Sequence, residues 1–204
     1  MADLAGYYPV TTAPNEVEVR PITPTQTTQS FSGKTRRTGY GGQFYEMKLN
    51  YAPMTALQHR PIQGFLAQAY GPQLSFEIIL PQISYSASEN PPSTTPSVAG
   101  GLSKGAKTVG ITNCGANKTV LVGGDFFKFN DHSKVYQATN TIVSDGSGNA
   151  TLYFAGSAVQ DIAGGVGLTI TAVPFTMILT QPNQSYTIGA GGIGSFNVEM
   201  REVW

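Results

Sequence analysis

Over residues 43–51 the chain alternates between apolar and polar side chains, one residue at a time. The apolar or aromatic set is Tyr45, Met47, Leu49 and Tyr51. A period of two is typical of a β-strand with one buried face, so the stretch predicts a strand. The alternation returns over residues 196–201, where the predicted core face is Phe196, Val198 and Met200 and the opposite face is Asn197, Glu199 and Arg201.

A helical period replaces this alternation between residues 55 and 70. Its apolar positions are Leu57, Ile62, Phe65, Leu66 and Ala69. Thr55 with Gln58 resembles a capping box, and Gly71-Pro72 supplies a stop signal. Because Pro61 lacks an N–H, we expect the regular helix to begin near Arg60 or Pro61, after an initial turn from Thr55. An apolar strand, LSFEIILP, follows and ends at Pro81.

Most of the remaining chain is typical of short strands joined by polar, Gly-rich turns. Several such runs between residues 108 and 155 predict consecutive hairpins and hence a small barrel or sandwich. Residues 84–101 are rich in Ser, Pro and Thr, which indicates a linker. Residues 1–30 carry four prolines and one alternating stretch, EVEVR, which indicates an extended arm or edge strand.

These patterns predict a mainly β protein of four parts, a split domain with an insert. Residues 1–30 form an extended N-terminal arm, and residues 31–85 with 165–204 form the main domain. Residues 86–100 are the linker, and residues 101–164 form an inserted small β-barrel. A chain of 204 residues is long enough to bury a proper core, roughly 70% of its extended-chain surface, without covalent staples.

Charge is sparse and balanced. Twelve basic and twelve acidic residues give a formal net charge of zero, and only 12% of residues are charged, about half the usual share. Such a surface repels its own copies weakly and suits lasting contact with other proteins. There is no run of 18 apolar residues, and MADLAGYYPV lacks the basic head and apolar core of a signal peptide, so we expect no membrane insertion.

Candidate catalytic and metal-binding residues are few. His132 lies between Asp131 and Lys134, so it could act as a general base held in place by the neighbouring carboxylate. Cys114 is the single cysteine, so an intrachain disulfide and a cysteine-based zinc site are excluded. With two histidines and no G-x-S-x-G, neither a nucleophile triad nor a three-histidine metal site is supported. We therefore expect no enzymatic activity, no cofactor and no metal.

Two motif-like strings are better explained as turns. Residues 189–194 match G-x-G-x-x-G, but a strand follows where a dinucleotide site needs a helix, which favours a Gly-rich hairpin loop. Residues 145–149 resemble the opening of a calcium loop, but Ala150 stands where the sharp turn needs glycine and position 12 has no glutamate. A tight turn between two strands is expected there.

Nucleic-acid binding has little support because the chain has no net positive charge. Phe126, Phe127 and Phe129 could stack bases, but alternation predicts two of them in the core and one exposed. Lys34, Arg36 and Arg37 form a small basic cluster, which could contact a phosphate or an acidic partner or simply belong to a solvated turn.

Three segments, taken in order, resemble a known family. They are TGYGGQFYEMKLNYAPMTALQHRPIQGFLAQAYGPQLSFEIILP, then VGGDFFKFNDHSKVYQATNTIVSDGSGNATLYF, and then VPFTMILTQPNQSY with the closing FNVEMREVW. Their order and spacing are similar to those of bacteriophage tail-tip and baseplate proteins of the distal-tail or baseplate-hub type. The resemblance covers roughly residues 30–204 and leaves out the Pro-rich N-terminal arm.

The resemblance implies a structural virion protein, assembled in the host cytoplasm and located in the phage tail. It implies a β-sandwich of the tail-tube or distal-tail type with a flanking helix. It also implies rings, commonly sixfold, at the distal end of the tail tube. The implied partners are copies of the chain and other tail tube, baseplate and fibre proteins, with DNA passing through the ring without specific binding.

Subunit contacts are predicted at strand edges, aromatic faces and chain arms. The candidate residues are Tyr7, Tyr8, Val10, Lys34, Arg36, Arg37 and Trp204, each of which could instead belong to a disordered tail or an ordinary core. The alternative function is a receptor- or carbohydrate-binding module of a tail fibre, in which Tyr136 or Tyr153 would stack on sugars.

Overall fold

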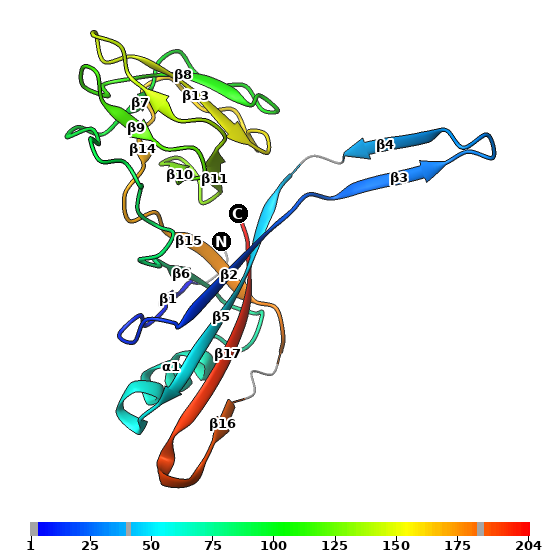
Figure 1. Cartoon of the computed structure of the whole chain (residues 1–204), viewed down its shortest axis with the longest axis vertical. Coiled ribbons are helices and arrows are strands. Elements are labelled where there is room, and N and C mark those ends of the chain that lie inside the picture. The colour runs from blue at the N-terminus through cyan, green and yellow to red at the C-terminus, as the bar shows by residue number, and fades with distance from the viewer. Residues whose placement is uncertain (1–3, 40–41, 183–185) are drawn as a thin grey trace.

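The computed structural model describes residues 4–39, 42–182 and 186–204. In this part of the chain the fold is mainly β, with one α-helix. Figure 1 shows three regions: a large twisted sheet with the helix at one end, a small barrel of strands above it, and a two-stranded hairpin that projects to one side.

The large sheet, called the main sheet below, joins both ends of the chain. Its strand order is β1-β6-β15-β17-β5-β2, and β16 adds to β17. The pair β1·β6 is parallel, and the other pairs are antiparallel. The strands are β1 (Leu4–Tyr7), β2 (Glu16–Ile22), β5 (Phe44–Met54), β6 (Ser75–Ile78), β15 (Phe175–Leu179), β16 (Tyr186–Ile188) and β17 (Gly194–Glu202).

The alternation predicted for β5 and β17 is confirmed. On β5 the residues Tyr45, Met47, Leu49 and Tyr51 are buried, and on β17 so are Phe196, Val198 and Met200. The residues between them on β17 are exposed. One face of the main sheet therefore packs on a core, and we call its opposite side the open face.

The helix α1 (Ala56–Gln68) starts earlier than predicted. Its capping box is confirmed, because the Thr55 N–H donates to Gln58 Oε1 at 2.9 Å. Pro61 lies inside the helix and has no N–H, so the hydrogen bond to the carbonyl of Leu57 is missing. Leu57 is exposed, contrary to its predicted place on the apolar face, so its carbonyl lies on the side of the helix that water can reach. The apolar face consists of Ile62, Phe65 and Leu66, with Ala69 just beyond the helix.

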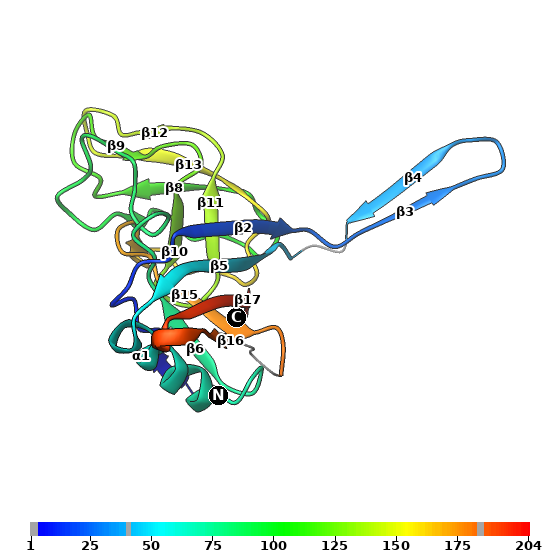
Figure 2. The same cartoon turned by 60° about the horizontal axis from the view of Figure 1, so that its bottom comes forward.

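The first 30 residues do not form a single arm. Strands β1 and β2 lie at opposite edges of the main sheet, which fits the edge-strand alternative. The projecting element is a separate hairpin of β3 (Thr25–Gln29) and β4 (Thr35–Gly39), which we call the hairpin arm. Figures 1 and 2 both show it extending away from the rest of the molecule.

The barrel domain is a six-stranded, nearly closed sheet with the order β14-β10-β11-β13-β8-β7. An antiparallel bridge between Ser97 and Gly167 brings its two ends together. The strands are β7 (Ser97–Val98), β8 (Thr108–Thr112), β10 (Phe126–Phe129), β11 (Val135–Ala138), β13 (Ala150–Ala155) and β14 (Leu168–Thr169), and a separate pair is formed by β9 (Thr119–Leu121) and β12 (Ile142–Val143). Strands β7 and β14 lie outside residues 101–164, so the barrel is longer than the predicted insert.

The Ser/Pro/Thr-rich segment before β7 is held against the barrel by polar contacts. The Asp125 carboxylate accepts hydrogen bonds from Ser86 Oγ, from the Ala87 N–H at 3.1 Å and from the Val122 N–H at 2.8 Å. Ser88 Oγ donates to the Thr119 carbonyl at 2.6 Å. The segment is thus an irregular part of the barrel surface.

Two cores form, and the barrel contributes to both. Phe127 and Phe129 belong to the barrel's own core. Phe126 and Val135, on the outside of the barrel, belong to the core under the main sheet. All three phenylalanines are therefore buried, which corrects the prediction of one exposed ring. The cause is that β10 is covered on both sides, which its sequence alone does not reveal.

Candidate assembly surfaces

The hairpin arm is built from residues that have no buried face. Every residue from 23 to 39 is exposed. Its turn is closed by backbone hydrogen bonds, from the Ser30 N–H to the Lys34 carbonyl at 3.0 Å and from the Gly33 N–H to the Ser30 carbonyl at 2.9 Å. Gly33 has φ +80°, a conformation that favours glycine. The arm is an ordered hairpin whose faces and outer strand edges are open.

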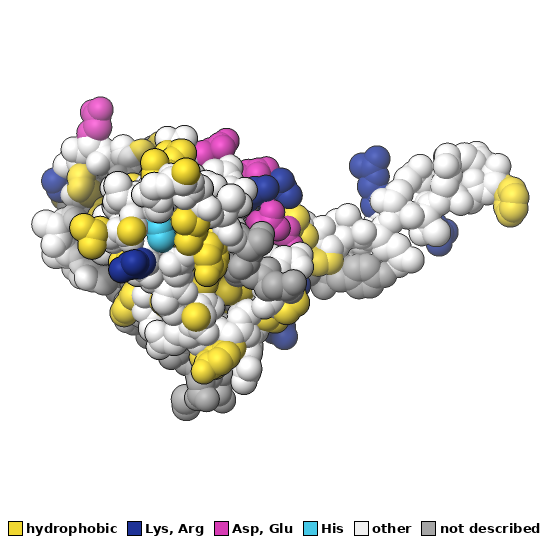
Figure 3. Space-filling view, turned by 90° about the horizontal axis from the view of Figure 1, so that it is seen from below, with side chains coloured by type: hydrophobic (Ala, Val, Ile, Leu, Met, Phe, Trp, Pro, Cys, Tyr) yellow, Lys and Arg dark blue, Asp and Glu magenta, His cyan; other side chains and the backbone are white. Residues whose placement is uncertain are grey.

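The basic cluster of Lys34, Arg36 and Arg37 lies on this arm. Residues 23–43 contain these three cations and no acidic residue, so the segment has a net charge of +3. The rest of the chain has nine basic and twelve acidic residues, a net charge of −3. Among the described residues, no ion pair involves the three cations. Figure 3 shows dark blue side chains on the arm and a yellow side chain at its tip.

The predicted contact residues are not gathered in one place. Tyr7 and Val10 are exposed near the edge strand β1. Tyr8 is buried in the core under the main sheet, where the Tyr51 hydroxyl donates to its hydroxyl at 3.1 Å, so it is not available as a surface contact. Trp204 is half-exposed at the far end of β17.

The open face of the main sheet carries a ladder of alternating charges. Glu18, Lys48 and Glu199 stand in register on β2, β5 and β17. The next row is Arg20, Glu46 and Arg201, in which the signs are reversed. Two ion pairs tie the ladder: Arg20 Nε to Glu18 Oε1 at 2.8 Å and Lys48 Nζ to Glu199 Oε1 at 3.3 Å. This side of the sheet is therefore polar and open to a partner.

A hollow of about 270 Å³ lies beside these rows, where β5 begins and β17 ends. It is lined by Phe44, Arg201, Glu202, Val203 and Trp204. The Arg201 guanidinium lies 5.9 Å from the centre of the Phe44 ring, and Lys134 Nζ lies 4.8 Å from that of Trp204. The hollow thus has two aromatic walls, each next to a cation.

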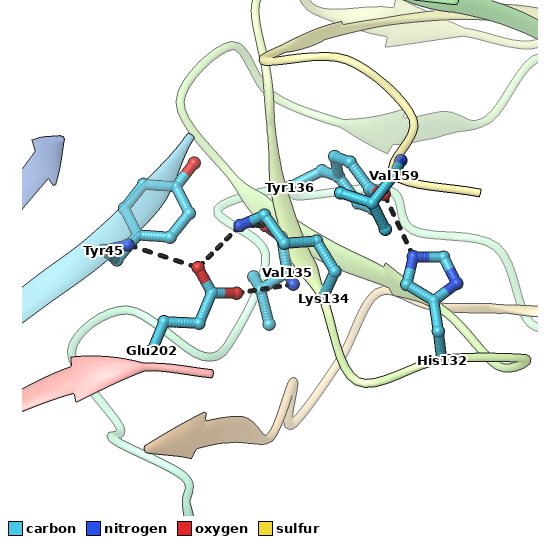
Figure 4. A network of polar contacts seen from close by, with 7 residues as sticks. All are labelled: Tyr45, His132, Lys134, Val135, Tyr136, Val159 and Glu202. Carbon is cyan, nitrogen blue, oxygen red and sulfur yellow. Dashed lines mark hydrogen bonds and ion pairs between the residues drawn. The ribbon is translucent and has the colours of Figure 1, made fainter. Parts of the chain in front are cut away.

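A buried ion pair fixes the barrel to the main sheet at the base of this hollow. Lys134 Nζ, from the barrel, lies 2.6 Å from Glu202 Oε2, and both side chains are almost fully buried. The Glu202 carboxylate also accepts hydrogen bonds from the Val135 N–H at 2.8 Å and the Tyr45 N–H at 3.2 Å (Figure 4). Burial raises the pKa of Glu202 and lowers the pKa of Lys134, and the attraction between the two opposes both shifts. The sequence predictions did not single out either residue.

The Asp131–His132 pair proposed from sequence does form, but inside a structural network. His132 Nδ1 lies 2.5 Å from Asp131 Oδ1. Figure 4 shows the other side of the ring, where His132 Nε2 lies 3.0 Å from the Tyr136 hydroxyl, which accepts a hydrogen bond from the Val159 N–H. Burial raises the pKa of Tyr136 to about 12, so its hydroxyl stays protonated near neutral pH. These groups bond to one another, and the arrangement joins the turn at residues 130–133 to the loop before Ile162.

The two motif-like strings are turns, as predicted. Asp145 Oδ1 accepts from the N–H groups of Ser147 at 2.8 Å and Asn149 at 2.9 Å, which lowers the pKa of Asp145. Residues 189–194 connect β16 to β17, and the Gly189 N–H donates to the Ile193 carbonyl at 2.8 Å. Within the described ranges, no three His, Cys, Asp or Glu side chains are grouped as a metal site would require. The one described α-helix is also too short and polar to cross a membrane.

Comparison with known sequences identifies no relative of the chain. No protein-family model matches the chain, and no curated protein matches it either.

Proposed function

We propose that the protein is a structural subunit that assembles with copies of itself, as a component of a phage tail at the baseplate or tail tip. The hairpin arm carries this proposal. A two-stranded hairpin is marginally stable alone in water, and open strand edges promote pairing with other chains. An arm that is exposed along all of residues 23–39 contributes nothing to the chain's own core. Its use is contact with a partner.

The rest of the surface supports a role in assembly. The main sheet ends at edge strands β1 and β2, and its open face is not covered by the helix or the barrel. In the proposed ring, closed by sixfold symmetry as the resemblance implies, neighbouring copies cover these edges and complete the β-sandwich. Such a ring would sit at the distal end of the tail tube and connect it to peripheral baseplate or fibre proteins.

A sugar-binding module has less support. Tyr136, one of the two tyrosines considered for stacking on sugars, is buried in the barrel core and bonded through its hydroxyl. Tyr153 remains partly exposed, but it stands alone on β13. Stacking sites need an accessible ring in a concave surface, so one exposed tyrosine does not make one.

Two measurements test the proposal together. Light scattering of the purified chain over a wide dilution series should show a concentration-dependent oligomer, and images of intact particles with the chain labelled should place it in the tail. A chain that is monomeric at every concentration and absent from particles would contradict the proposal. Retention of a monomer or trimer on immobilised host glycans would favour the receptor-binding alternative.

A further inference from the structure

The tip of the hairpin arm presents one large apolar side chain. Phe31 is fully exposed, within a turn that backbone hydrogen bonds hold in shape. Aromatic side chains that fill a partner's pocket are the usual anchors of protein interfaces. The basic residues Lys34, Arg36 and Arg37 follow within six positions. The arm therefore combines an aromatic anchor with a short run of positive charge.

The open face of the main sheet offers the complementary features in the same order. Phe44, Glu46 and Lys48 are alternate residues of β5, so their side chains lie on the same face of the strand. The aromatic hollow therefore opens at the end of the charged rows. Glu46 stands between Arg20 and Arg201 in the first row beyond the hollow, and Glu18 and Glu199 flank Lys48 in the second. A partner that enters the hollow with an aromatic ring meets the single carboxylate of the first row and then the two carboxylates of the second.

The spacing of the two patterns agrees. Arg36 pairs with Thr28, three residues from Phe31 along the arm, which is about 10 Å at about 3.3 Å per residue. From Phe44 the first row of the open face is two residues away and the second is four, about 7 and 13 Å. With Phe31 in the hollow and the arm lying along β5, Arg36 falls between the two rows.

The hollow that receives Phe31 belongs to another copy. Phe44 pairs with Ile22, at the root of the arm, whereas Phe31 lies nine residues further on, about 30 Å away along an extended strand. Figures 1 and 2 show the arm directed away from its own main sheet. The arm segment at +3 and the remaining chain at −3 also attract each other between copies.

We propose that the hairpin arm of one copy docks on the open face of a second copy, with Phe31 in the hollow between Phe44 and Trp204. This inference rests on the proposed function, self-assembly, and specifies its contact. Because the arm and the hollow are different surfaces, the contact is head-to-tail and generates a ring when the rotation between copies closes. Arg36 extends the alternating charges of Glu18, Glu46 and Glu199, whereas Arg37, the next residue of β4, points to the other face of the arm.

Engineered cysteines test the docking with little background, because burial raises the pKa of Cys114, the natural cysteine, to about 11. One chain carries Ser32→Cys, next to Phe31, and a second carries Val203→Cys, which lines the hollow and leaves both aromatic walls intact. After mixing and mild oxidation we expect a disulfide dimer that forms about tenfold faster than in the controls, because docking raises the effective concentration of the two thiols.

Two matched controls accompany this pair. Leu57→Cys replaces Val203→Cys and puts an exposed thiol on α1, at the opposite end of β17 from the hollow, since Gly194 at the start of β17 contacts His59 of that helix. Phe31→Ser is added to Ser32→Cys, which removes the anchor and keeps the thiol. Both controls should lose the fast cross-link.

Equal rates with Val203→Cys and Leu57→Cys would overturn the docking. So would a Ser32→Cys/Val203→Cys double variant that closes its disulfide within a monomer, because the arm would then fold back on its own chain. Light scattering of the untreated wild-type protein separates this failure from a failure of the proposed function. An oligomer without the specific cross-link contradicts only the docking, whereas a monomer contradicts both.

Discussion

Lys134 and Glu202 bury two opposite charges between the barrel and the main sheet. Removing one partner of such a pair leaves an uncompensated charge, at a cost of about 3–5 kcal/mol, whereas replacing both with apolar residues is often neutral or stabilising. We expect Lys134→Met to lower the free energy of unfolding by that amount and Lys134→Met/Glu202→Leu to restore most of it. Urea denaturation measures both, and a double variant as unstable as the single one would contradict this account.

The single variant should also acquire an unusual pH dependence. Burial already raises the pKa of Glu202 in the folded protein, and Lys134→Met removes the cation that lowers it. A raised folded-state pKa gives stability that is present below the unfolded-state value, near 4.5, and is lost as the pH rises through the folded-state pKa. Lys134→Met should therefore be more stable near pH 5 than near pH 8. The double variant, which lacks this carboxyl, is the control, and the same pH dependence in both would exclude Glu202 as its cause.

Gly194 provides a residue-scale test of the contact between β17 and α1. A Cβ at this position would lie 2.9 Å from His59 Cδ2 and 3.1 Å from Phe196 Cε2. Overpacking of this kind costs about 1–3 kcal/mol, so Gly194→Ala should lower stability by that amount. Gly189→Ala is the matched control, because its Cβ would lie no closer than 3.7 Å to a neighbouring atom and its φ is −86°. Equal denaturation midpoints for both variants would contradict this, because they would show that α1 can shift to accommodate the added methyl group without loss of stability.

At the scale of elements, Asp125 fixes the irregular segment before β7. Asp125→Ala leaves the N–H groups of Ala87 and Val122 without their acceptor, and a lost hydrogen bond to a charged group costs about 1.5–3 kcal/mol. We expect faster amide hydrogen exchange at Ala87 and lower stability of the barrel. Ser86→Ala, which removes one donor and keeps the carboxylate, should have a much smaller effect. Unchanged exchange at Ala87 would mean that other contacts hold the segment.

The elements with one buried face could be predicted from the sequence. Strands β5 and β17 have a clear period of two, and Thr55 with Gln58 marks the start of α1. The hairpin arm could not be found in this way, because TQTTQ and TRRTG have no apolar face and hydrophobic alternation is the main strand signal. Its available signals were the threonines, which favour strands, and the turn-forming sequence SFSGK at residues 30–34.

Residue contacts between distant segments were beyond sequence reasoning for a different reason. Lys134 and Glu202 are 68 positions apart and meet only because β11 packs near the end of β17. Phe44 and Trp204 form one hollow because the start of β5 pairs with the end of β17. Tyr8 shows the converse, since an aromatic residue in a Pro-rich arm is expected to be exposed and instead fills the core under α1. Tertiary placement decides each of these cases.

In the whole molecule, folding and the proposed assembly depend on different parts of the chain. The two cores and the buried ion pair stabilise the chain, and the hairpin arm lies outside both cores. Replacing residues 24–39 with a short Gly-Ser turn should therefore change the free energy of unfolding by no more than about 1 kcal/mol, the size of the loop-closure entropy involved. The same deletion should abolish self-association.

Native mass spectrometry of the wild-type and arm-deleted chains shows whether the hairpin arm is needed for self-association. Both chains are measured at the same concentration, after denaturation curves have shown equal stability. We expect a closed oligomer of the wild-type chain and a monomer of the arm-deleted chain. The same mass distribution for both chains, whether monomer or oligomer, would contradict the claim that the hairpin arm builds the assembly.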